Sequence, residues 1–217
     1  MQIRLENIGK YKVPPETRGG KCLEIGANVG SFTEKYKDHF GVIHYYEPVR
    51  KCFEIIQGKI KSDNIVGFNL ACAKRSGNEV EIIMHQNNDS GSCALKNEIT
   101  SVHEEWDKTN VIQKVQTISL EDCISKIGGS VDYCKSDCET SEYNIFYNQD
   151  LTPIKYLAIE IHHQIGIQKW RNLLAYIQKT HGIIKGNVSY SERQNKEFLF
   201  KRKQHIIVKN PKTGVWA

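Results

Sequence analysis

The amino-acid sequence predicts an α/β domain in three layers, with helices on both faces of a mostly parallel sheet. Three observations predict this fold class: short apolar runs alternate with helical periodicity, no repeat or low-complexity linker divides the 217 residues, and the C-terminal end has a strand pattern alone. A chain of this length can bury a core without disulfide or metal support. We therefore expect one domain over residues 1–217, with residues 1–20 as an N-terminal extension.

Strands are predicted where short runs of apolar and β-branched residues are bounded by turn signals. These runs are Lys21–Ile25, Val42–Tyr46, Ile65–Cys72, Glu79–Met84, Val115–Thr117, Val131–Lys135 and Ile154–Ile161. Two more runs, Glu197–Lys201 and His205–Lys209, predict a closing antiparallel hairpin. The polar stretch over residues 85–110 is a predicted lid or insertion, because long irregular segments inside a domain usually have a function.

Helices are predicted from capping residues and from apolar spacing. Ser31 and Glu34 form a Ser-x-x-Glu capping box, which predicts a helix that begins at Ser31. Pro48 is expected in the first position of a second helix, and a third is expected over Ser119–Lys126. A long amphipathic helix ends at His181-Gly182 and has one apolar face, formed by Trp170, Leu173, Leu174 and Ile177.

Composition excludes several classes of protein. Thirty Lys and Arg against 25 Asp and Glu give a net charge of +5, too small for a dedicated nucleic-acid binder. No apolar run approaches the roughly 18 residues of a membrane span, and the N-terminus lacks the apolar segment of a secretory signal. The seven cysteines contain no Cys-x-x-Cys pair. We therefore expect a cytoplasmic protein with reduced cysteines, without a zinc site or a disulfide framework.

A glycine-containing turn follows the first predicted strand. Gly26 ends that strand, Gly30 precedes the first helix, and Glu47 ends the second strand. Ligands of open α/β sheets bind beyond such strand ends, where an acidic residue accepts both hydroxyls of a ribose. The dinucleotide and P-loop glycine motifs are absent, which favours a nucleoside ligand without a pyrophosphate, namely S-adenosylmethionine (SAM). The alternative is a tight strand–helix turn that binds no ligand.

The segment Glu-Ile-Gly-Ala-Asn-Val-Gly-Ser-Phe-Thr (residues 24–33), followed by Tyr-Glu-Pro (46–48), resembles the FkbM family of SAM-dependent methyltransferases. Three more blocks agree in order and spacing over about residues 20–165: Asn69-Leu-Ala71 with Gly77, residues 131–142, and Ile159-Glu-Ile-His162. Thr140 differs from the glycine of the family block, and Ser136 and Cys138 differ from its aliphatic residues.

The resemblance implies a Rossmann-like SAM-methyltransferase fold with a seven-stranded sheet. It places Glu47 on the ribose of SAM, Pro48, Ala71 and Cys72 beside the adenine, and the glycine turn on the methionine half. The residues implied for that turn and the adjoining helix are Glu24, Gly26, Ala27, Asn28, Gly30, Ser31 and Phe32.

Candidate catalytic residues follow two consecutive predicted strands. Asp137 and Glu139 follow one strand, and Glu160 and His162 end the next. If the strands are neighbours, these groups converge as a base network, or Asp137, Glu160 and His162 bind Mg²⁺ or Mn²⁺. Lys135 is a further catalytic candidate. There are alternatives for each residue. Asp137 binds the cofactor's amino group or caps the following helix, and Glu139 and Glu142 stabilise a helix N-terminus. His162 makes a structural hydrogen bond, and Lys135 forms an ion pair.

Acceptor recognition is assigned to the insertion over residues 85–110. Ser90 and Ser92 lie in a serine-rich segment suited to a hydroxyl-rich substrate, and Trp106 is suited to stacking on a sugar; a solvated loop and a core anchor are the alternatives. The resemblance implies an O-methyltransferase that acts on a hydroxyl of a sugar or glycan. The alternatives are an RNA or protein methyltransferase and a non-catalytic SAM-fold module. A module of a larger multidomain glycan-assembly protein is a further alternative.

Overall fold

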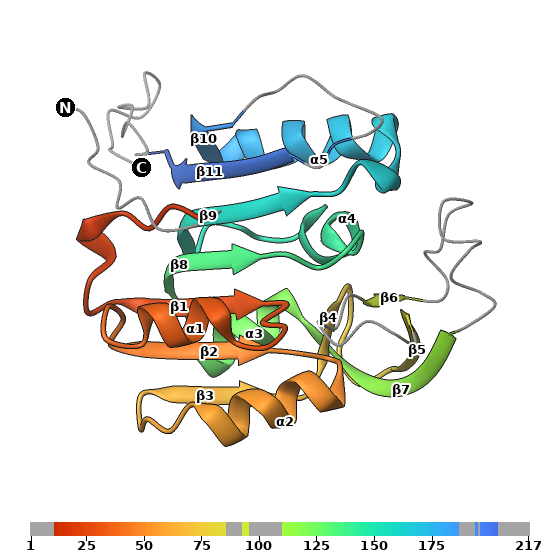
Figure 1. Cartoon of the computed structure of the whole chain (residues 1–217). Coiled ribbons are helices and arrows are strands. Elements are labelled where there is room, and N and C mark those ends of the chain that lie inside the picture. The colour runs from red at the N-terminus through yellow and green to blue at the C-terminus, as the bar shows by residue number, and fades with distance from the viewer. Residues whose placement is uncertain (1–10, 86–92, 96–109, 187–193, 195, 204–217) are drawn as a thin grey trace, which may run out of the picture.

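The central feature of the fold is a seven-stranded sheet with the strand order β10-β11-β9-β8-β1-β2-β3 (Figure 1). The computed structural model describes residues 11–85, 93–95, 110–186, 194 and 196–203. The strands are β1 (Lys21–Ile25), β2 (Val42–Tyr46), β3 (Ile65–Phe68), β8 (Val131–Ser136), β9 (Ile154–Ile161), β10 (His181–Lys185) and β11 (Lys196–Arg202). All pairs are parallel except those of β11, which runs antiparallel to β9 and β10. The predicted fold class, a mostly parallel α/β sheet with antiparallel strands at its C-terminal end, is confirmed.

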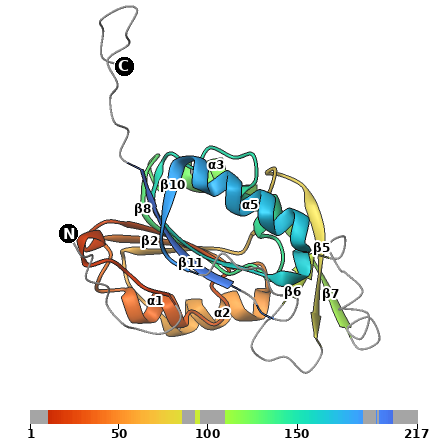
Figure 2. The same ribbon diagram turned by 90° about the horizontal axis from the view of Figure 1, so that it is seen from above.

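Helices cover both faces of this sheet, as Figure 2 shows from above. The helices α1 (Ser31–Tyr36) and α2 (Arg50–Lys59) lie on one face, and α3 (Leu120–Lys126) and α5 (Ile167–Thr180) lie on the other. The short helix α4 (Glu142–Phe146) follows β8. The apolar face predicted for α5 is confirmed, because Trp170, Leu173, Leu174 and Ile177 are all buried. Coverage of both faces explains why β9 is mostly apolar and why nearly every residue of β8 and β9 is buried.

A second, smaller sheet has the order β4-β7-β5-β6. Its strands are β4 (Ala71–Ala73), β5 (Glu79–His85), β6 (Cys93–Leu95) and β7 (Asn110–Ser119). The single strand predicted over Ile65–Cys72 is wrong, because the chain leaves the main sheet after Phe68 and β4 pairs with β7 instead. The strand predicted at Val115–Thr117 is longer than expected, since its pairing with β5 begins at Asn110.

Two predicted details of the helix N-termini differ from the structure. The helix α1 begins at Ser31 as predicted, but the predicted capping box is wrong: Gly30 is the N-cap residue, with a φ of 79°, and no side chain caps α1. Pro48 precedes α2, whose N-cap is Val49, instead of occupying its first position. The start of α3 is as expected, because the Ser119 hydroxyl accepts a hydrogen bond from the backbone N–H of Asp122.

The C-terminal antiparallel pair consists of β10 and β11. The sequence predicted that Glu197–Lys201 pairs with His205–Lys209. This prediction is wrong, because β11 is hydrogen-bonded to β10 on one side and to β9 on the other. Residues 205–209 lie outside the described part of the chain. The predicted helix end at His181-Gly182 is corrected by one residue: α5 ends at Thr180, and His181 begins a strand that the sequence did not predict.

Six cysteines have free thiols that pack as small apolar groups. Cys22, Cys52, Cys72, Cys123 and Cys134 are buried, and Cys138 is partly buried. None of the helices in the described ranges combines the length and the apolar character needed to cross a lipid bilayer.

Candidate active site

A cleft opens at the carboxyl ends of β1, β2 and β8, where a parallel sheet binds its ligands. It offers about 710 Å³ of space, including the open solvent at its mouth. The lining residues are Ile25, Gly26, Asn28, Tyr46, Glu47, Pro48, Ala71, Cys72, Ile82, Lys135, Asp137, Cys138, Glu139 and Ser141.

The glycine turn forms one wall of this cleft. Gly26 has a φ of 76°, and a Cβ atom on it would lie 1.9 Å from the carbonyl oxygen of Asp137. Any side chain at this position would therefore separate the turn after β1 from the turn after β8. The turn is held to β2 as well, because Gly26 and Ala27 both donate backbone hydrogen bonds to the carbonyl of Tyr46.

Glu47 lies at the end of β2 and is 3% exposed. Its Oε2 accepts a hydrogen bond of 2.6 Å from the backbone N–H of Asn28, and its Oε1 accepts one of 2.8 Å from Val49. Burial raises the pKa of Glu47 to about 7, although both hydrogen bonds favour the ionised form. A carboxylate that lines the cleft and keeps acceptor capacity on each oxygen is suited to bind a pair of hydroxyls.

Stability should depend on pH through Glu47. A carboxyl group whose pKa is raised on folding binds its proton more tightly in the folded state, so stability falls as pH rises between its unfolded and folded pKa values. Between about pH 4.5 and 7, the free energy of unfolding of the ligand-free native protein should therefore fall by about 3 kcal/mol relative to that of Glu47→Gln. Urea unfolding of both proteins across this range measures the difference, and a difference that does not vary with pH would contradict it.

The apolar wall of the cleft comes from the end of β2 and from the small sheet. Tyr46, Pro48, Ala71, Cys72 and Ile82 lie on this wall. The backbone at Pro48 is fixed by two amide side chains, because Asn69 and Gln113 each donate a hydrogen bond to its carbonyl oxygen. The small sheet therefore shapes the side of the cleft next to Glu47, and flat apolar walls of this kind suit an aromatic base.

Glu24 and Lys135 form a buried ion pair under the glycine turn. The Nζ atom of Lys135 lies 3.5 Å from Oε1 of Glu24 and also donates a hydrogen bond to the Gly26 carbonyl. The hydroxyl of Thr33 donates to Oε2 of Glu24. Burial raises the pKa of Glu24, and the ammonium of Lys135 opposes that effect. Glu24 is fully buried, so it supports the turn from below, while Lys135 also lines the cleft.

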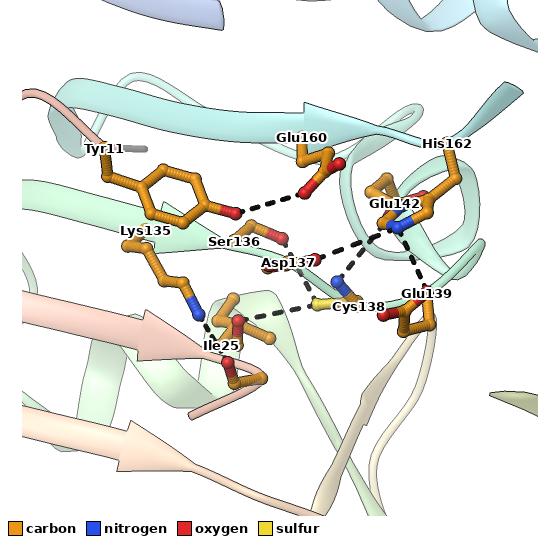
Figure 3. A network of polar contacts seen from close by, with 11 residues as sticks. Tyr11, Ile25, Lys135, Ser136, Asp137, Cys138, Glu139, Glu142, Glu160 and His162 are labelled. Atoms are coloured by element: carbon orange, nitrogen blue, oxygen red, sulfur yellow. Dashed lines mark hydrogen bonds and ion pairs between the residues drawn. The ribbon is translucent and has the colours of Figure 1, made fainter. Parts of the chain in front are cut away.

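An acid–histidine cluster lies beside the cleft, at the ends of β8 and β9 (Figure 3). We define it as Asp137, Glu139, Glu142, Glu160 and His162. The strands β8 and β9 are parallel neighbours with Ser136 opposite Ile159, so the residues that follow leave the sheet side by side. The convergence expected from the sequence is therefore confirmed.

His162 lies at the centre of the cluster and is 2% exposed. Its Nδ1 lies 2.7 Å from Oε1 of Glu142, and its Nε2 lies 3.1 Å from Oε2 of Glu139 and 3.8 Å from Oδ1 of Asp137. Burial lowers the pKa of His162, but the carboxylates of Glu142 and Glu139 outweigh burial and raise it to about 10. The imidazole is therefore held between a buried carboxylate on one side and two more exposed ones on the other.

Tyr11 brings the N-terminal extension to the same cluster. Its hydroxyl lies 3.5 Å from Oε2 of Glu160, and its pKa is raised by burial and by Asp137. The ammonium of Lys135 lies 5.4 Å from the centre of its ring. Figure 3 shows Tyr11 and Lys135 on the side of the cluster opposite His162. The cluster thus has a closed side at Tyr11 and an open side at Asp137 and Glu139, which line the cleft.

The turn between β8 and α4 contains two non-glycine residues in the left-handed region: Glu139 has a φ of 45° and Thr140 a φ of 87°. A β-branched residue is strained in this conformation. The Thr140 hydroxyl is also buried, with no hydrogen-bond partner among the described residues. The threonine that differs from the FkbM family's glycine therefore adopts a conformation that favours glycine.

Replacing Thr140 with glycine should raise the free energy of unfolding by about 1 kcal/mol, because a left-handed conformation costs roughly that much more with a Cβ atom. Thr140→Ala is the matched control, since it removes the hydroxyl but keeps the Cβ atom. Chemical denaturation of the three proteins tests this, and a glycine variant less stable than the alanine variant would show that the turn is not strained.

The predicted cofactor residues fall into two groups. Gly26, Asn28, Glu47, Pro48, Ala71 and Cys72 line the cleft. The others do not line the cleft. Glu24 forms the buried ion pair, Gly30 is the N-cap of α1, and Ser31 is exposed. Ala27 and Phe32 pack in apolar clusters. Among the predicted catalytic residues, Lys135, Asp137 and Glu139 line the cleft, while Glu160 and His162 lie behind them in the cluster.

Several residues of the site were not assigned to it from the sequence. Tyr11 and Ile82 come from segments with no motif, and Ser141 was assigned no role. Glu142 was interpreted only as a helix N-terminal acid, yet it is fully buried against His162. Its position three residues after Glu139, in the block that resembles the family, was the available signal. The predicted acceptor residues Ser90, Ser92 and Trp106 lie outside the described residues.

Comparison with known protein families and structures agrees with this geometry. Residues 24–185 match the family model described as the methyltransferase FkbM domain. None of the curated proteins matches the chain. Among solved structures, the chain is similar to the methyltransferase FkbM from Methylobacillus flagellatus KT, with 14% identity and a TM-score of 0.50. That match covers 83% of this chain but 43% of the other, so this chain spans less than half the length of that protein.

Two further similar structures are methyltransferases with other activities. One is an rRNA methylase from Streptococcus thermophilus, with 7% identity, a TM-score of 0.47 and coverage of 88% of this chain and 92% of that one. The other is the N-methyltransferase NodS from Bradyrhizobium japonicum WM9 in complex with S-adenosylhomocysteine, with 10% identity, a TM-score of 0.44 and coverage of 85% and 78%. The family model matches most of the chain, and the chain therefore belongs to the FkbM methyltransferase domain family.

Proposed function

We propose that this domain is a SAM-dependent O-methyltransferase that acts on a hydroxyl of a sugar or glycan. The observation that carries the proposal is one cleft lined by Glu47 and by two residues of the acid–histidine cluster, Asp137 and Glu139. Glu47 is suited to hold the ribose of SAM, and Asp137 and Glu139 are positioned to meet an acceptor.

The residues of the cleft are suited to SAM. Glu47 presents a buried carboxylate for the two ribose hydroxyls, and the apolar wall between Tyr46 and Ile82 would accept the adenine. The glycine turn, with Gly26 and Asn28 at positive φ, exposes backbone groups where the methionine half would lie. When bound, SAM supplies an electrophilic methyl group on a sulfonium.

The acid–histidine cluster is suited to an alcohol acceptor. An alcohol is a weak nucleophile at neutral pH, so its proton must be removed as its oxygen attacks. Asp137, at the mouth of the cluster, would receive that proton while the oxygen–methyl bond forms and the sulfur–methyl bond breaks, leaving S-adenosylhomocysteine. Asp137 and Glu139, the two acids positioned to meet the acceptor, also disfavour RNA, because they would repel its phosphates. A neutral, hydroxyl-rich molecule is the acceptor class that these charges favour.

Calorimetry with SAM, followed by transfer of labelled methyl groups to a panel of acceptors, tests the proposal. The panel contains neutral mono- and oligosaccharides, ribosomal RNA and a mixed peptide library. We expect saturable SAM binding and labelling of saccharides alone. Labelling of RNA or peptide in preference to saccharides would replace the proposed acceptor class, and the absence of SAM binding would contradict the proposal itself.

A further inference from the structure

We infer that the acid–histidine cluster binds a divalent cation of the Mg²⁺/Mn²⁺ class, through Asp137, Glu160 and His162. One ligand atom from each of these residues lies within 4.8 Å of the other two. Ligand atoms at about 2.1 Å from an octahedral Mg²⁺ lie about 3 to 4.2 Å apart, so small side-chain movements would bring the three atoms around one ion. Two carboxylates and one imidazole from the ends of β8 and β9 suit Mn²⁺ or Mg²⁺ better than a thiolate-binding metal.

The hydrogen bonding of His162 is an independent indication. A histidine that binds a metal usually donates its other ring N–H to a carboxylate, which fixes the tautomer and the direction of the ring. Nδ1 of His162 lies 2.7 Å from the buried carboxylate of Glu142, so Nε2 is the nitrogen that faces Asp137 and Glu139. Glu142 comes from the first turn of α4, and its Oε1 also accepts a hydrogen bond from the backbone of Cys138. Glu142 is thus a positioning residue for His162.

Charge is the second indication. The cluster contains four carboxylates, and within it His162 is the one group that can be cationic. Glu142 and Glu160 are buried, and Oε2 of Glu142 has no hydrogen-bond partner among the described residues. Lys135 forms its ion pair with Glu24. Buried carboxylates are costly unless a positive charge compensates them. His162 can supply one positive charge, and a divalent cation would supply two more.

The cation would lie at the boundary between the cluster and the cleft, because Asp137 belongs to both. There it would bind the oxygen of the acceptor hydroxyl and lower its pKa, so that the proton leaves more readily to a neighbouring carboxylate. This role rests on the proposed methyltransferase function, whereas binding of the ion itself does not.

The test uses Mn²⁺ alone as the probe, with the full chain and without SAM. Titration followed by electron paramagnetic resonance should show one bound Mn²⁺ per chain, displaced by excess Mg²⁺, and pulsed measurements should show coupling to an imidazole nitrogen. Asp137→Asn should weaken Mn²⁺ binding at least tenfold, Glu142→Gln should weaken it by about 10- to 100-fold, and His162→Gln should abolish the nitrogen coupling. Asp38→Asn is the control. Asp38 is an exposed acid between α1 and β2, near the amino ends of the parallel strands, whereas the cluster lies at their carboxyl ends.

No saturable binding at millimolar Mn²⁺ would overturn the inference. Binding that is equally tight in Asp137→Asn and His162→Gln would also overturn it. Asp137 is partly exposed, so its asparagine variant is expected to fold, and circular dichroism checks this for all variants. SAM calorimetry on the same samples separates the two proposals: SAM binding without Mn²⁺ binding overturns only the metal site, and Mn²⁺ binding without SAM binding overturns only the proposed function.

Discussion

Replacing Glu47 with glutamine should weaken SAM binding by about 100-fold. Glu47 is the buried carboxylate on the cleft wall, and two charge-assisted hydrogen bonds to ribose hydroxyls contribute roughly 1.5–3 kcal/mol each. Glutamine keeps the size of the side chain but replaces one acceptor oxygen with a donor. That donor would face the backbone N–H of Asn28 or of Val49, so the glycine turn would lose an anchor as well.

Calorimetric titration of SAM into both proteins measures the effect. The matched control is Glu54→Gln, which makes the same substitution on the exposed side of α2 and removes only a surface ion pair with Arg50. Binding to the native protein should also strengthen as pH rises through about 7, because ionised Glu47 is the better acceptor. A Glu47→Gln affinity within threefold of the native value would show that this residue does not bind the ribose.

Asp137→Asn should reduce methyl-transfer turnover by about a thousandfold while leaving the SAM dissociation constant within about threefold of the native value. General-base removal of a proton contributes typically 10²–10⁴-fold to a rate, and Asp137 is the acid that belongs both to the cleft and to the cluster around His162. Because its side chain is 23% exposed, asparagine should be accommodated without unfolding.

Steady-state kinetics on the saccharide identified by the acceptor panel, together with SAM calorimetry, checks this result. The control is again Asp38→Asn, because Asp38 lies near the amino ends of the parallel strands and the cleft lies at their carboxyl ends. A loss of SAM affinity equal to the loss of turnover would instead assign Asp137 to the amino group of SAM. Full turnover in the variant would remove Asp137 from the mechanism.

The sequence was sufficient for the parts of the site that depend on strand ends. Glu47, Asp137 and Glu160 each follow or end an apolar run, and parallel strands bring such positions to one edge of the sheet. That rule predicted the cleft and the cluster without knowledge of any loop. Periodicity also predicted the helices α1, α3 and α5 and most strands of the main sheet, since helical and strand periodicities differ strongly in this chain.

Other features depend on contacts between distant residues and could not be predicted in this way. Tyr11 reaches Glu160 across 149 positions of sequence, and nothing near Tyr11 indicates that partner. Ser31 and Glu34 are the residues of a capping box, but the N-cap position is occupied by Gly30 in a left-handed conformation, so Ser31 is the first helical residue and its side chain caps nothing. The strand β10 was missed because His181-Gly182 indicates a helix end, and only pairing with β11 makes the next residues a strand.

The contact between Gly26 and the Asp137 carbonyl has a mechanical consequence. It joins the turn that follows β1 to the turn that follows β8, and these strands are hydrogen-bonded neighbours. Adjacent strands lie about 4.8 Å apart whatever the surrounding loops do. The separation between the turn after β1 and the turn after β8 is therefore set by the backbone hydrogen bonds of the sheet. In the proposed function, the distance between the glycine turn and Asp137 would therefore not depend on the loops that surround the acceptor.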